Sequence, residues 1–132
     1  MLVIGFQEIV QLTPGKVLSA AASAQAFAEW SSHLTALVDA IRPGGYVLIA
    51  SCHLVGLAMF VFASQTVLPF IREVQRDQVK TGMGGMTGNK GAVGVRCTLH
   101  SSSLSFVCAH LAAGQKEVLQ RDVRLSRCLL LM

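Results

Sequence analysis

The chain has 132 residues, a length that suits one domain with a hydrophobic core of its own. Its composition, 52% hydrophobic and 14% charged, excludes an intrinsically disordered chain and is typical of a heavily buried sheet. The net charge of +4 lies in the second half, since residues 1–66 hold two Lys or Arg against three Asp or Glu, and residues 67–132 hold nine against four. This polarity favours an anionic partner, although any single cation is equally well explained as an ordinary solvated side chain.

The first predicted strand ends in a carboxylate. Alternate positions near the N-terminus carry Leu2, Ile4, Phe6 and Glu8. This period of two predicts a buried strand with Glu8 at its exit, on the same face as the apolar residues. A carboxylate there is a candidate metal ligand, while the residue type alone is more often a surface residue. No basic leader precedes the strand, which favours a cytoplasmic protein.

A packing helix is predicted over residues 23–42. Apolar side chains recur there at helical spacing, at Phe27, Trp30, Leu34, Leu37, Val38 and Ile41. Ser23 is the expected N-cap, and the Pro-Gly-Gly run at 43–45 ends the helix. His33 is expected at the surface with no chemical role.

The longest apolar stretch predicts two adjacent buried strands, roughly residues 46–53 and 55–63. A membrane span is rejected because polar residues and a glycine interrupt the stretch near its middle. A short helix or turn is expected at residues 66–71, around Pro69, and a more polar strand at residues 72–81. The four cysteines show no Cys-x-x-Cys spacing, three of them lie in apolar strand-like runs, and they are expected to be reduced core residues.

Residues 80–91 are rich in glycine, which predicts a loop whose backbone approaches a ligand closely. Asn89 and Lys90 lie between the last two glycines, and an amide beside an ammonium suits a phosphate or an oxyanion. The spacing is neither that of a nucleotide-binding P-loop nor that of a dinucleotide fingerprint. We therefore predict that Asn89 and Lys90 bind substrate.

Alternation of apolar residues continues after the loop and predicts strands at residues 91–99 and 104–110. His110 ends the second strand on the same face as Phe106 and Cys108, a position that commonly lines a cleft. From Gln115 onward the spacing indicates an amphipathic helix.

Three segments together resemble the inositol polyphosphate 5-phosphatases, most closely the synaptojanin type. They are IGFQEIV at residues 4–10, KTGMGGMTGNKGAV at residues 80–93 and FVCAHLAAGQ at residues 106–115. The similarity spans roughly residues 4–121, and the combined pattern is far more specific than any one motif. It implies an α/β chain that is part of a four-layer α/β sandwich of the exonuclease, endonuclease and phosphatase superfamily, whose fold is that of deoxyribonuclease I.

The resemblance also implies an incomplete domain. The family's Gly-Asp-Phe/Leu-Asn and Ser-Asp-His motifs and an upstream Trp-Asn segment are absent, and similarity fades after Arg121. We therefore expect residues 1–132 to be an N-terminal and central portion of a catalytic domain. Such a portion lacks a group to orient the attacking water, so we expect it to be inactive by itself.

The implied activity is Mg²⁺-dependent removal of the 5-phosphate from phosphoinositides such as phosphatidylinositol 4,5-bisphosphate, at a cytoplasmic membrane surface. Glu8 is the implied metal ligand and a catalytic residue, and His110 is the implied contact to the scissile phosphate. Asn89 and Lys90 are expected to hold the headgroup. Met83 and Met86 either touch acyl chains or pack within the loop.

Two other functional classes stay open: a phosphoinositide-binding or interaction fragment without catalysis, and a nuclease of the same superfamily. The nuclease is disfavoured, and nucleic acid is not an expected partner, because the aromatic residues do not interleave with basic ones. Phosphate release, cleavage of plasmid DNA, or binding without turnover distinguishes the three classes.

Overall fold

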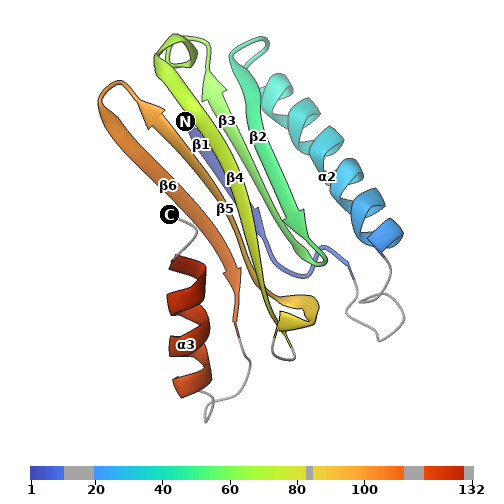
Figure 1. Cartoon of the computed structure of the whole chain (residues 1–132). Helices are drawn as coiled ribbons and strands as arrows, with labels where there is room; N and C mark the ends of the chain where they lie inside the picture. Colours follow the sequence, from blue (N-terminus) through green and yellow to red (C-terminus); the bar gives the residue numbers. More distant parts are fainter. Residues whose placement is uncertain (11–19, 83–84, 112–117, 130–132) are drawn as a thin grey trace.

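The computed structural model describes residues 1–10, 20–82, 85–111 and 118–129. Within these ranges the chain folds as long antiparallel strands flanked by two α-helices (Figure 1). The helices are α2 (Ala20–Ile41) and α3 (Val118–Leu129), with a short 3₁₀ turn, η1 (Leu68–Phe70). The strands are β1 (Leu2–Phe6), β2 (Tyr46–Leu54), β3 (Leu57–Ser64), β4 (Ile71–Gly82), β5 (Thr87–Leu99) and β6 (Ser102–His110).

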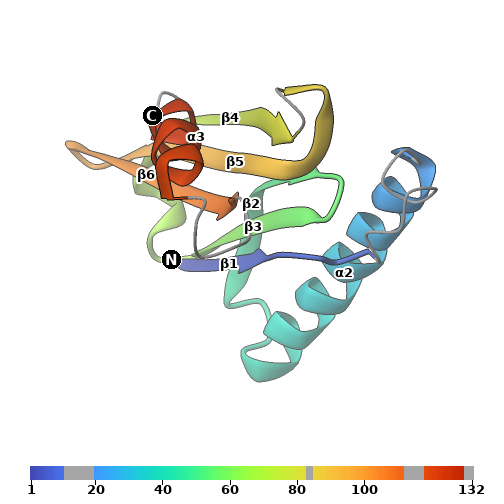
Figure 2. The ribbon, with the colours of Figure 1, turned by 90° about the horizontal axis from the view of Figure 1, so that it is seen from below.

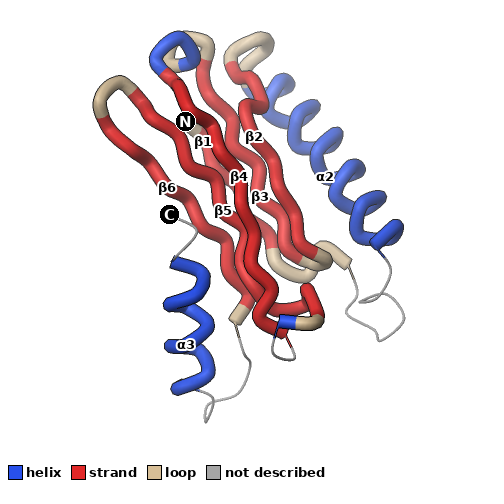
Figure 3. Tube along the Cα trace, viewed as in Figure 1, coloured by secondary structure: helices blue, strands red, loops and turns tan. Residues whose placement is uncertain are grey.

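The described strands form two three-stranded antiparallel sheets, with the orders β1-β3-β2 and β4-β5-β6. β2 pairs with β3, β4 with β5 and β5 with β6, each with its neighbour in sequence (Figure 3). β1 pairs with β3, although α2 and β2 lie between them in the chain. In the second sheet, Lys80 pairs with Gly91, and Gly91 pairs with His110. One row of residues therefore crosses all three strands near the end of β6.

The two sheets pack face to face; α2 lies against the first sheet, and α3 lies beside one end of the second (Figure 2). Helix α2 covers the β1-β3-β2 sheet, while α3 contacts β4, β5 and β6. This arrangement confirms the predicted four-layer α/β sandwich. The strands expected around residues 46–63, 72–81, 91–99 and 104–110 are confirmed, as is the turn around Pro69.

Strand β3 is buried on both faces, which explains its nearly continuous apolar sequence. Leu57, Met59 and Val61 face the other sheet, where they pack with Val93 and Val95 of β5. The intervening residues face α2, namely Ala58, Phe60 and Phe62. The two parities of one strand thus supply both cores of the molecule.

Helix α2 packs on the second of these cores, through Leu34 and Val38. The predicted N-cap role of Ser23 is wrong, because the helix already begins at Ala20. Ser23 is instead buried inside the helix, and its hydroxyl donates a hydrogen bond to the Val55 carbonyl at 2.5 Å. His33 is exposed, as expected.

The glycine-rich segment is more regular than the sequence indicates. Strand β5 already begins at Thr87, so Gly88, Lys90 and Gly91 belong to a strand rather than to a loop. A Cβ atom at Gly88 would lie 2.7 Å from Val55 Cγ2 and 3.0 Å from a Leu54 methyl. This glycine is therefore explained by the close approach of the β2–β3 turn.

Three of the four cysteines confirm the expected reduced state, while the side chain of Cys128 lies outside the described residues. Cys52, Cys97 and Cys108 are free thiols, and burial raises the pKa of Cys52 to about 11. No described helix is long and apolar enough to cross a membrane. Helix α3 confirms the expected C-terminal helix. The predicted start of that helix at Gln115 lies outside the described residues, and so does Met83.

We expect Phe60→Ala to lower the free energy of unfolding by about 3–5 kcal/mol, because this ring is fully buried between β3 and α2. Phe70→Ala is the matched control: that ring is 48% exposed and stacks on His100, so we expect a smaller loss, of about 1.5 kcal/mol. Urea denaturation measures both values. Equal losses in the two variants would contradict the assignment of the core.

We expect the unfolding free energy to fall as the pH drops below about 6.5, because burial lowers the pKa of His53 in the folded chain. His53 stacks on Phe27 with ring centroids 4.2 Å apart. The unfolded chain then binds more protons, which makes acid destabilising. His53→Gln should flatten this dependence, and Gln25→Ala, which changes no titrating group, should not. Urea midpoints across this pH range measure it, and identical slopes would count against the prediction.

Candidate active site

Three of the four side chains selected from the sequence gather at one end of the sandwich. Glu8 follows β1, Lys90 lies near the start of β5, and His110 ends β6. Figure 1 shows β6 ending at the lower end of the molecule, where β5 begins, and the chain running on from β1 toward that end. The Lys90 Nζ atom lies 2.6 Å from His110 Nε2, and Glu8 Oε1 lies 3.5 Å from the same nitrogen. We call these three residues the site cluster.

His110 is the centre of the site cluster and is largely buried, since its side chain is only 12% exposed. Burial lowers the pKa of His110, the Lys90 cation lowers it further, and the Glu8 carboxylate opposes both effects. A neutral imidazole accepts the hydrogen bond of the Lys90 ammonium at Nε2, which places the ring proton on Nδ1. The site cluster thus presents a cation, a neutral imidazole and a carboxylate side by side.

Backbone packing around Gly91 brings Lys90 to His110. Gly91 pairs with His110 across the β5–β6 ladder and with Lys80 across the β4–β5 ladder. A Cβ atom at Gly91 would collide with the Val79 carbonyl of β4. A side chain at position 91 would therefore push β4 away and displace the row in which the site cluster lies.

Glu8 is held in an unusual backbone conformation, with a φ of 58°. Such a left-handed conformation is uncommon for residues other than glycine. The strand alternation predicted that Glu8 shares a face with Ile4 and Phe6, and this is wrong: those residues pack toward α2, whereas Glu8 reaches His110 on the other sheet. The positive φ breaks the alternation and redirects the carboxylate.

Neighbouring contacts hold this segment in place. The Ile9 amide donates a hydrogen bond to the Gly56 carbonyl at 3.0 Å, and the Gln7 side-chain amide donates one to the Ala109 carbonyl at 2.7 Å. Sequence reasoning missed Gln7, because no periodic pattern links it to a residue 102 positions away. The contact forms only because the two sheets stack.

Asn89 does not join the site cluster. Its side-chain oxygen accepts a hydrogen bond from the Thr87 hydroxyl at 2.7 Å. Successive residues of a strand point to opposite faces, so Asn89 and Lys90 diverge. A substrate-binding role for Asn89 stays a prediction.

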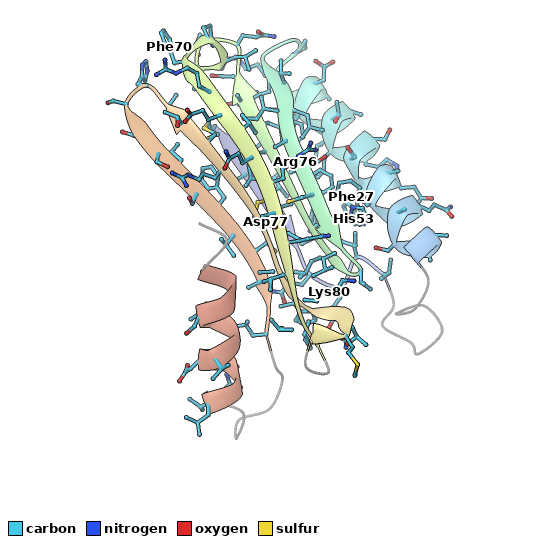
Figure 4. The ribbon with its side chains drawn as sticks, in the orientation of Figure 1. Phe27, His53, Phe70, Arg76, Asp77 and Lys80 are labelled. Carbon is cyan, nitrogen blue, oxygen red and sulfur yellow. The ribbon has the colours of Figure 1, made fainter. Side chains whose placement is uncertain are left out.

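Other polar side chains lie along β4, where Figure 4 labels Arg76, Asp77 and Lys80. Lys80 is in register with Gly91 and His110, so it adds a cation at the end that holds the site cluster. Arg76 instead bonds toward the other sheet, with its Nη1 atom 3.4 Å from the Ser51 carbonyl. The positive charge noted in the sequence is therefore only partly concentrated at the site.

The donor set fits a magnesium ion that keeps most of its water. Among the described residues, no group of three His, Cys, Asp or Glu side chains is close enough to enclose a metal. Mg²⁺, however, is commonly held by one or two carboxylates together with substrate phosphates and several waters. Glu8 is such a carboxylate, since its side chain is 62% exposed beside the phosphate-compatible Lys90.

The chain is similar to known proteins in both sequence and fold. Residues 1–129 match the family described as Endonuclease/Exonuclease/phosphatase family 2. Synaptojanin-1 of Homo sapiens is 49% identical over 119 residues, which is 90% of this chain and 7% of that protein. Inositol-1,4,5-trisphosphate 5-phosphatase 1 of Schizosaccharomyces pombe is 43% identical over 122 residues, 91% of this chain and 11% of that protein.

A solved structure shares the fold. It is the inositol polyphosphate 5-phosphatase domain of SPsynaptojanin in complex with inositol (1,4)-bisphosphate and calcium ion, with a TM-score of 0.74 and 37% identity. The match covers 92% of this chain and 34% of that one, so the present chain spans about a third of the solved domain. Sequence and fold agree, and the chain belongs to the endonuclease/exonuclease/phosphatase family 2, as a synaptojanin-like portion of an inositol polyphosphate 5-phosphatase domain.

Proposed function

We propose that this chain is the metal-binding and phosphate-binding portion of a Mg²⁺-dependent phosphatase that removes the 5-phosphate of phosphoinositides such as phosphatidylinositol 4,5-bisphosphate. The observation that carries the proposal is the site cluster, which joins a carboxylate just after β1 to a cation of β5 and a largely buried imidazole of β6. The relative solved with inositol (1,4)-bisphosphate and calcium ion supports both the ligand class and a divalent cation.

Each member of the site cluster has a distinct task in this proposal. Mg²⁺, when bound, neutralises charge on the phosphoryl group, which is the main demand of phosphate-monoester hydrolysis. Glu8 holds the ion through its exposed carboxylate. The Lys90 ammonium, which lies beside His110, donates to a phosphate oxygen, and His110 contacts the scissile phosphate.

The surroundings of the site cluster are compatible with a headgroup at a membrane surface. Lys80 lies in the same row of the sheet and adds positive charge there. Met86 is 76% exposed, and its contact with acyl chains remains a hypothesis beside simple packing within its turn. We place the protein at the cytoplasmic face of membranes, as a peripheral protein.

The experiment that tests the proposal measures three signals on the purified chain with Mg²⁺. They are phosphate release from phosphatidylinositol 4,5-bisphosphate vesicles, nicking of plasmid DNA, and binding of inositol (1,4)-bisphosphate. Binding that needs Mg²⁺ and Glu8 supports the proposal. Plasmid nicking would favour the nuclease alternative, and binding that is independent of both would favour an interaction fragment.

We expect Lys90→Ala to weaken the binding of inositol (1,4)-bisphosphate by about 10- to 100-fold, because a hydrogen bond to a charged group is lost. The fold should persist, since the substitution removes no fully buried side chain. Arg42→Ala is the matched control: it removes one positive charge just beyond the far end of α2. Calorimetric titration and circular dichroism measure the two properties. Equal affinities in the two variants would remove Lys90 from the site.

We expect the 132-residue chain to bind without turnover. None of the three members of the site cluster is assigned to deprotonate the attacking water, and general-base assistance typically contributes about 10²- to 10⁴-fold. Colorimetric phosphate release, with Glu8→Ala and His110→Ala as controls, checks this. Mg²⁺-dependent release that both substitutions abolish would show that the chain carries a complete catalytic set.

A further inference from the structure

The chain segments at the ends of β1 and β6 are aligned residue by residue across the interface between the two sheets. The Cys108 thiol lies 3.6 Å from the Phe6 carbonyl, the Gln7 amide bonds to the Ala109 carbonyl at 2.7 Å, and Glu8 lies 3.5 Å from His110. Three successive positions of one strand end thus contact three successive positions of the other. The strands belong to different sheets, so no backbone ladder sets this alignment.

Side chains therefore have to set the alignment. Gly5 lets the strands approach, since a Cβ atom there would lie 3.1 Å from Cys108 Sγ. The thiol contact one residue later is long and weak, as sulfur contacts are. Gln7 makes the short contact, and it does so to the residue immediately before His110.

Glu8 lies between two such anchors. Gln7, before it, is fixed to the carbonyl of Ala109, and Ile9, after it, donates its amide proton to the Gly56 carbonyl of the β2–β3 turn. A left-handed conformation in a residue other than glycine persists only where the surroundings impose it. The two anchors supply that constraint, and only the Gln7 anchor depends on a side chain.

We propose that Gln7 is a positioning residue that fixes the end of β1 to β6, holds Glu8 in its left-handed conformation and so sets the carboxylate beside His110. Gln7 acts through the main chain, because its side-chain amide donates a hydrogen bond to the Ala109 carbonyl. The consequence for metal binding rests on the proposed function. The contact by which Gln7 fixes the segment, which we call the clamp, does not rest on the proposed function, because it is a property of the metal-free fold.

The first test needs no metal and compares Glu8→Gly with Glu8→Ala. Glycine tolerates a left-handed φ and alanine does not, so we expect the glycine variant to melt at the higher temperature while Gln7 is present. In a Gln7→Met background the segment relaxes to a negative φ, and the order should reverse or the difference vanish. The same difference in both backgrounds, or no advantage of glycine with Gln7 present, overturns the clamp.

The second test measures the affinity for Mn²⁺ by electron paramagnetic resonance, in the presence of inositol (1,4)-bisphosphate. Gln7→Met keeps length and net charge and removes the donor, so we expect about 10- to 100-fold weaker binding with little change in melting temperature. Gln25→Met is the matched control, because it loses an equally exposed hydrogen bond on α2. Equal affinities in the two variants contradict the positioning role.

The two tests separate this inference from the proposed function. If the unsubstituted chain binds no Mn²⁺, the metal role of Glu8 fails, and the metal consequence of the clamp fails with it. The order of the residue-8 variants still decides whether Gln7 holds the segment.

Discussion

Packing of the two sheets face to face is the constraint on which the rest of the structure depends. Their shared core joins β3 to β5 through residues such as Met59, Val61, Val93 and Val95. Burial of this apolar surface is the main favourable term in folding and is non-directional, so it brings the sheets together without fixing how they are aligned. Alignment comes from shape and from polar contacts at the edges, where β1 meets β6.

The arrangement of the site cluster depends on how the two sheets are aligned. Glu8 and His110 belong to different sheets, while Lys90 and His110 belong to neighbouring strands of one. Burial and the Lys90 cation both lower the pKa of His110, the Glu8 carboxylate opposes them, and the Nε2 atom accepts the hydrogen bond of the Lys90 ammonium. A shift of one sheet against the other would leave Lys90 with His110 and would remove only the carboxylate.

Glycine has a different role in the structure from the one its density in residues 80–91 indicates. The sequence predicts conformational freedom, whereas Gly88 and Gly91 lie in β5 and are explained by crowding against Val55 and against the β4 backbone. The glycine content of a segment shows that side chains are absent there, but it does not show which neighbour requires their absence. Ser23 is a similar case: a residue typical of a helix start is used as a buried donor to a neighbouring turn.

The sequence by itself determined the alternation of the strands, the packing helix, the four-layer class and the family, because these depend on local periodicity and on the order of motifs along the chain. It also selected Glu8, Lys90 and His110, which the fold brings together. Only the tertiary structure decided that Glu8 leaves its strand with a positive φ, that Asn89 turns away, and that Gln7 bonds to Ala109. These features arise from contacts between sheets, which link residues far apart in the chain and leave no periodic signal in it.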